Sequence, residues 1–107
     1  MQEPLYFMNQ EEDALHAIRS GKLVCVLLYT KDSVLSSRAM SIVSSNENRL
    51  YSSGCSVFYV HVKSDPSLEE FSCVRVPQLR FFVRGKLSCS ITGVFDESSL
   101  YECIRNM

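Results

Sequence analysis

Apolar runs alternate with polar, helix-patterned segments along most of this 107-residue chain, and the alternation predicts an α/β fold. The runs are rich in aromatic and β-branched residues and have the lengths of strands. Residues 23–29 are almost uninterrupted in their apolarity, which is typical of a central strand that carries helices on both faces of its sheet. The predicted strands are residues 5–8, 23–29, 57–62, 79–83 and 88–91.

The segments between the strands carry helix signals. Asn9 and Glu12 form a capping-box pattern at the start of the first predicted helix. The longest predicted helix covers residues 33–50 and turns one face toward the sheet. That face consists of Leu35, Ala39, Ile42, Val43 and Asn46. The two remaining predicted helices are residues 67–71 and a final helix capped by Asp96.

The resulting order, βαβαβαββα, fits one domain over residues 1–107. Strands joined through helices predict a parallel part of the sheet, and the last two strands, joined by Arg84-Gly85-Lys86, predict an antiparallel hairpin. The sequence therefore predicts a central mixed sheet with helices on both faces.

Composition and charge narrow the classes of function. The chain is 46% hydrophobic with a net charge of -1 and no run of like charges, so electrostatics favour neither nucleic acid nor an anionic membrane. No apolar segment approaches the ~20 residues of a membrane span, and residues 1–4 lack the features of a signal peptide. The partner we expect is a protein or peptide, and the chain itself can be a monomer or a homodimer.

The five cysteines, which are Cys25, Cys55, Cys73, Cys89 and Cys103, contain no C-x-x-C pair and no spacing typical of a metal site. Apolar or small neighbours surround each one, which suggests buried, reduced thiols and a cytoplasmic location. One disulfide stays compatible with the sequence, because pairing cannot be read from spacing. We expect no metal and no cofactor.

The stretch from Val76-Pro77 through the Phe81-Phe82 strand to the Gly85-Lys86 turn resembles the thioredoxin family. The predicted order of elements matches the thioredoxin fold over almost the whole chain. The resemblance implies that Pro77 lines a peptide-binding groove and is cis, although the sequence alone leaves its isomer open. The same residues also fit a plain hairpin in which Pro77 serves only the architecture.

In the register of this resemblance, the two catalytic cysteines of thioredoxins fall on serines, within the segment Ser33-Val34-Leu35-Ser36. A serine hydroxyl is un-ionised at neutral pH and forms no mixed disulfide, so dithiol oxidoreduction at this position is excluded. Serine is also a preferred helix N-cap, which gives Ser33 a structural explanation.

The resemblance leaves a peptide groove as the candidate site. Its predicted residues are Ser33, Val34, Ser36, Arg75, Val76, Pro77 and Gly93. A partner strand would pair with the backbone of Val76, and Arg75 would cover the groove or select for charge. The first hypothesis is thus a redox-inactive, chaperone-like interaction module. The alternative is a monothiol or glutathione-linked thiol–disulfide enzyme that uses a lone cysteine such as Cys73.

Overall fold

The computed structural model describes residues 10–30, 33–62, 76–93 and 95–106. The elements in these ranges, in chain order, are α1 (Glu11–Arg19), β1 (Val24–Tyr29), α2 (Val34–Ser45), α3 (Glu47–Ser52), β2 (Ser56–His61), β3 (Gln78–Val83), β4 (Lys86–Thr92) and α4 (Glu97–Arg105). The strand predicted at residues 5–8 and the helix predicted at residues 67–71 lie outside the described residues.

The described strands form a mixed sheet in the order β2-β1-β3-β4. β1 pairs in parallel with β2 and antiparallel with β3, which in turn pairs antiparallel with β4. Every residue of β1 is buried, as expected for the central strand of a sheet that is covered on both faces. The prediction of a central mixed sheet is therefore confirmed.

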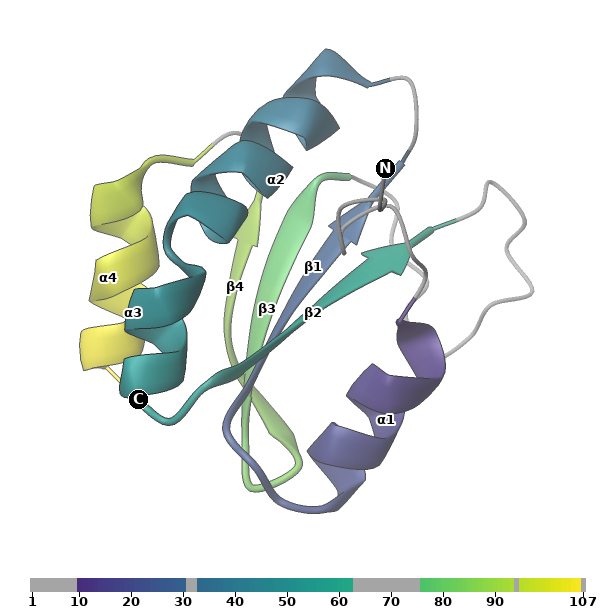
Figure 1. Ribbon diagram of the computed structural model, residues 1–107, viewed down its shortest axis with the longest axis vertical. Coiled ribbons are helices and arrows are strands. Elements are labelled where there is room, and N and C mark those ends of the chain that lie inside the picture. Colours follow the sequence, from purple (N-terminus) through teal and green to yellow (C-terminus); the bar gives the residue numbers. More distant parts are fainter. Residues whose placement is uncertain (1–9, 31–32, 63–75, 94, 107) are drawn as a thin grey trace.

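Helices cover both faces of this sheet (Figure 1). α1 packs on one face through Ala14, Ala17 and Ile18, which contact alternate residues of β1. α2, α3 and α4 lie on the opposite face over a larger core that includes Phe81 and Leu100. This arrangement follows from the period-2 alternation of β1, whose successive side chains enter the two cores in turn.

The start of the first helix and the bounds of the hairpin differ from the prediction by one or two residues, since β4 begins at Lys86 and was predicted from residue 88. The N-cap of α1 is Gln10, one residue after the predicted Asn9, and the Gln10 backbone N–H donates to the Tyr59 carbonyl at 3.0 Å. In the turn between β3 and β4, Gly85 takes a positive φ of 81° and Arg84 takes one of 53°. Two positive φ values suit the right-handed twist of a tight hairpin.

The helix predicted over residues 33–50 is two helices, α2 and α3, because the chain bends at Asn46. The predicted inward face of α2 was wrong at its first turn. Ser36, Ala39, Met40 and Val43 are the buried residues, whereas Leu35 is 45% exposed. The reason is that Ser36, one residue after Leu35, lies over the end of β1, where its hydroxyl accepts a hydrogen bond from the Thr30 backbone N–H.

Asn46 is buried at the junction of α2 and α3, and its side chain joins three parts of the fold. Its Nδ2 donates to the Ile42 carbonyl at 2.7 Å and to Glu97 Oε1 at 3.4 Å. Its Oδ1 accepts from the Tyr101 hydroxyl, which also accepts from Arg49 Nη1 at 2.9 Å. A buried amide with these partners fixes the bend and holds α4 against it.

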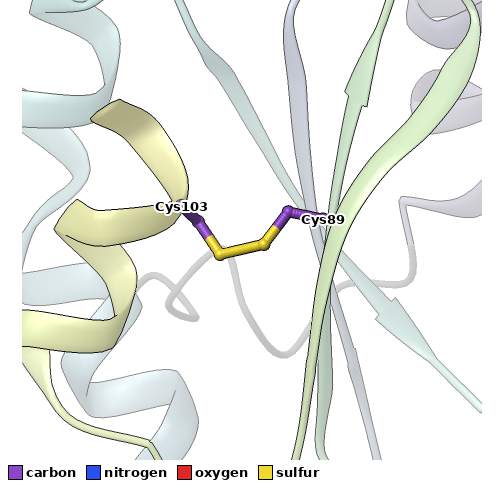
Figure 2. The surroundings of a disulfide bond; sticks show 2 residues. All are labelled: Cys89 and Cys103. Carbon is purple, nitrogen blue, oxygen red and sulfur yellow. A yellow bond between two sulfur atoms is a disulfide. The ribbon is translucent and has the colours of Figure 1, made fainter. Parts of the chain in front are cut away.

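A disulfide joins Cys89 of β4 to Cys103 of α4 (Figure 2). Their Cα atoms are 6.2 Å apart, within the usual range for a disulfide. The prediction of reduced thiols was wrong for this pair, because folding brings together two residues that the sequence separates by 14 positions. The expected cytoplasmic location was argued from reduced thiols, and the disulfide removes that support.

Candidate functional site

Three segments of the predicted groove lie at one end of the sheet. Leu28 of β1 pairs with Gln78 of β3, and Gln78 pairs with Thr92 of β4. The residues that follow β1, precede β3 and follow β4 therefore share this end of the sheet (Figure 1). The backbone N–H of Gly93 donates to the Pro77 carbonyl at 2.9 Å, which fixes these two predicted site residues beside each other.

Ser33 is the N-cap of α2, and its Oγ accepts a hydrogen bond from the Ser36 backbone N–H at 3.2 Å. This confirms the structural explanation for Ser33, since the cap satisfies an amide that the first helical turn leaves without a partner. Ser36 was predicted to contact a partner and is instead fully buried, with its Oγ bonded to the Thr30 N–H at 3.2 Å. Both hydroxyls are therefore engaged within the fold.

Two apolar side chains are exposed at this helix start. Val34 is 75% exposed and Leu35 is 45% exposed. Next to them lies an open hollow of about 570 Å³ whose lining includes Val34, Arg38 and Ser41. Val34 was a predicted site residue, whereas Leu35 was predicted to lie in the core, so its exposure is the part of this surface that the sequence did not predict.

The described residues of the segment before β3, Val76 and Pro77, have no reactive side chain and offer the site only backbone groups. The Val76–Pro77 peptide bond is cis, and Pro77 is buried. The Val76 side chain packs against the core under α1. Among the described residues, nothing forms a hydrogen bond with the Val76 backbone. Arg75 and Cys73 lie outside the described residues.

Tyr29 ends β1 at the same end of the sheet and is fully buried. Its hydroxyl has no hydrogen-bond partner among the described residues, and its ring lies 5.5 Å from the His61 ring, centre to centre. Burial raises the pKa of the Tyr29 phenol. A neutral phenol at this depth is a packing residue and supplies no general base at neutral pH.

The described residues contain no cluster of three or more metal-ligating side chains, and none of their helices is long and apolar enough to cross a membrane.

No protein-family model and no curated protein sequence matches the chain. Solved structures do. The oxidised thioredoxin O2 of Arabidopsis thaliana shares 16% identity and a TM-score of 0.75, over 92% of this chain and 86% of its own. Oxidised mitochondrial thioredoxin 3 of Saccharomyces cerevisiae is 14% identical, with a TM-score of 0.75. The match covers 97% of this chain and 100% of the thioredoxin. The chain has the thioredoxin fold.

Trxlp from Edwardsiella tarda EIB202 is a further similar structure, with 18% identity and a TM-score of 0.73 over 88% of this chain and 92% of its own. The TM-scores establish the thioredoxin fold. Identities this low do not show that the chain shares the activity of these proteins.

Proposed function

We propose that the chain is a protein-interaction module without dithiol chemistry, and that it holds an extended partner segment at the start of α2. The observation that carries this proposal is the exposed apolar pair Val34 and Leu35, beside two serines whose hydroxyls are engaged within the fold. A surface with apolar contact area and no activated nucleophile suits binding better than catalysis.

The neighbouring groups suggest what the partner segment carries. An apolar side chain would cover Val34, and an acidic side chain would reach the exposed side chain of Arg38, which lines the adjacent hollow. The backbone of Val76 is available, among the described residues, to pair with an extended strand at the same end of the sheet. The proposed partner is therefore an extended peptide that combines apolar and acidic residues, as an adaptor or chaperone-like protein would bind.

Peptide selection tests this proposal. Random peptides displayed on phage are selected on the parent protein, and the affinity of the best peptide is measured by titration calorimetry. We expect Val34→Asp to weaken binding at least about tenfold, because it places a charge in an apolar contact and beside an acidic partner. The matched control is Leu87→Asp, which alters another exposed apolar residue (53%, against 75% for Val34) at the start of β4, at the opposite end of the sheet.

Equal loss of affinity in both variants, or none in Val34→Asp, would place binding elsewhere and refute the proposal. Arg38→Glu gives a second test. It should weaken the binding of acidic peptides and leave the affinity for neutral peptides about unchanged.

A thiol–disulfide enzyme is the second candidate, because similar structures include oxidised thioredoxins and this chain holds both a disulfide and free thiols. The lone cysteine proposed for this role is Cys73. Titration of the native protein with a thiol reagent distinguishes the two candidates. A single fast, low-pKa thiol that is lost in Cys73→Ser supports the enzyme, whereas uniformly slow thiols support the binding module.

A further inference from the structure

The β3–β4 turn and the C-terminal ends of α1, α3 and α4 lie at one end of the sheet, opposite the start of α2 (Figure 1). A hollow of about 370 Å³ opens at this end. Leu23, Val83 and Ile104 supply its apolar lining, and Leu23 and Ile104 also pack against the larger core. The other lining residues are Gly21, Ser53 and Arg84. The hollow is therefore a mainly apolar surface where several elements meet.

Contacts between these elements fix the shape of the hollow. Val83 pairs with Lys86 across the β3–β4 turn. A side chain at Gly85 would lie 3.5 Å from the Ile18 carbonyl oxygen, so the turn lies against the end of α1. The disulfide attaches α4 to β4 at the residue before Ile104. The lining thus belongs to packed elements, which suits a preformed binding surface.

Exposed cations surround this apolar lining. Arg84 lines the hollow itself. Lys22 and Arg105 are next to lining residues in the sequence, and Lys86 pairs with one across the turn. All four side chains are exposed, and no ion pair among the described residues neutralises any of them. We call this surface the basic hollow.

The acidic side chains of the described residues are kept away from the basic hollow. Those other than Glu102 lie at the N-terminal ends of α1, α3 and α4, and they are Glu11, Glu12, Asp13, Glu47, Asp96 and Glu97. Glu102 is two residues before Ile104, which places it about 200° around α4 from the hollow. The basic hollow therefore carries a positive potential although the net charge of the chain is -1.

Helix dipoles explain only part of this charge. Arg105 lies in the last turn of α4, where the helix C-terminus stabilises a cation. Lys22, Arg84 and Lys86 lie outside the helices. Arg84 also has a positive φ of 53°, at a hairpin position where Asn and Gly are preferred. The turn itself does not favour arginine there, which points to a role for its side chain beside the hollow.

We propose that the basic hollow binds an acidic segment of a partner protein, with one apolar side chain in the hollow and carboxylates around it. The apolar lining suits the anchor, and cations from three segments of the chain suit several separate carboxylates. Arg84 would hold one carboxylate through paired N–H donors. This site lies at the end of the sheet opposite Val34 and does not depend on the proposed function.

Amide NMR of the full chain, titrated with synthetic peptides, tests the proposal. The probe is the capped peptide Glu-Glu-Leu-Glu-Glu at up to millimolar concentration, and its controls carry Gln for every Glu or Ser for the Leu. We expect shifts at the amides of Leu23, Ser53, residues 83–86 and Ile104 that weaken as salt is added. Neither control peptide should cause them. No shifts, or equal shifts with the Gln peptide, would overturn the proposal.

The position of the shifts separates this site from the surface at the start of α2. Shifts confined to residues 34–41 would assign the acidic peptide to that surface and would also overturn the proposal. Shifts with a short single-stranded oligonucleotide, and none with the peptide, would assign the basic hollow to nucleic acid instead.

Arg84→Asn removes the guanidinium and keeps the turn. Affinity for the probe should fall at least about fivefold, because a carboxylate loses its charged partner. The midpoint of urea unfolding should not fall, since Asn-Gly is a preferred hairpin turn. Arg80→Gln is the matched control, because Arg80 is three residues from Val83 in β3 and so lies on the opposite face of the sheet. Parental affinity in Arg84→Asn, or an equal loss in Arg80→Gln, would contradict the assignment.

Discussion

Ser33 shows how a single residue can serve structure at a position where the resemblance to thioredoxins implies chemistry. Its hydroxyl accepts a hydrogen bond from the Ser36 N–H and so caps α2. The Ser36 hydroxyl in turn accepts from the Thr30 N–H, which links the start of α2 to the end of β1. Both serine hydroxyls at the start of α2 thus form hydrogen bonds that stabilise the fold.

The cap makes a prediction at this scale. Ser33→Ala should lower the free energy of unfolding by about 1 kcal/mol, because the first turn of α2 loses the acceptor of an amide hydrogen bond. The measurement is equilibrium unfolding in urea. Ser37→Ala, one turn later on the exposed side of α2, is the control, and alanine's higher helix propensity should leave it neutral or slightly stabilised. Equal stability of the two variants would show that the Ser33 hydroxyl is not a cap.

At the scale of elements, the bend at Asn46 and the Cys89–Cys103 disulfide hold the helical layer together. Asn46 fixes the angle between α2 and α3 and reaches Glu97 and Tyr101 of α4. The disulfide attaches the same helix, α4, to β4. α4 is therefore bound to its neighbours from two sides, by hydrogen bonds and by a covalent bond.

Asn46→Ala should lower the free energy of unfolding by about 2–3 kcal/mol, because it leaves the Ile42 carbonyl and the Tyr101 hydroxyl without this partner. Urea unfolding measures the effect. The exposed Asn48, on the same stretch of chain, provides the control variant Asn48→Ala, which should change stability by less than about 0.5 kcal/mol. If Asn46→Ala lowers the free energy of unfolding no more than Asn48→Ala does, the buried amide does not stabilise the bend.

Reduction of the Cys89–Cys103 disulfide should lower the free energy of unfolding by about 3 kcal/mol, since the bond closes a loop between residues 14 positions apart and restricts the unfolded chain. Urea unfolding with and without a phosphine reductant measures this difference. A Cys89→Ser, Cys103→Ser double variant should respond to the reductant by no more than about 0.5 kcal/mol. A parental protein whose mapped disulfide is intact, yet whose stability is unaffected by reduction, would contradict the prediction.

At the scale of the whole molecule, strong periodic patterns predicted the architecture well. The apolarity of residues 23–29 identified the central strand, and the order of elements predicted the mixed sheet with helices on both faces. The errors in the predicted architecture arose at features that depend on contacts between elements distant in sequence. The bend at Asn46 depends on contacts with α4, and the Cys89–Cys103 pairing depends on the packing of α4 on β4.

The site was less accessible to sequence reasoning than the fold. Ser33, Pro77 and Gly93 were placed at one end of the sheet as the resemblance implied. The burial of Ser36 and the exposure of Leu35 were not foreseen, because a one-residue shift of the helical face exchanges the two. The presence of Cys25 and Cys55 in the same core was also missed, since it depends on the parallel register of β1 with β2.

The central claim is that this thioredoxin fold binds without dithiol turnover, and insulin reduction tests it most directly. The protein is assayed with dithiothreitol as reductant and with a thioredoxin in parallel. We predict a rate equal to the uncatalysed background, because the start of α2 carries Ser33 and Ser36 and no cysteine, and Cys25 and Cys55 are buried from protein substrates. Turnover comparable to that of the thioredoxin would contradict the account and assign the chain to the redox enzymes of its fold.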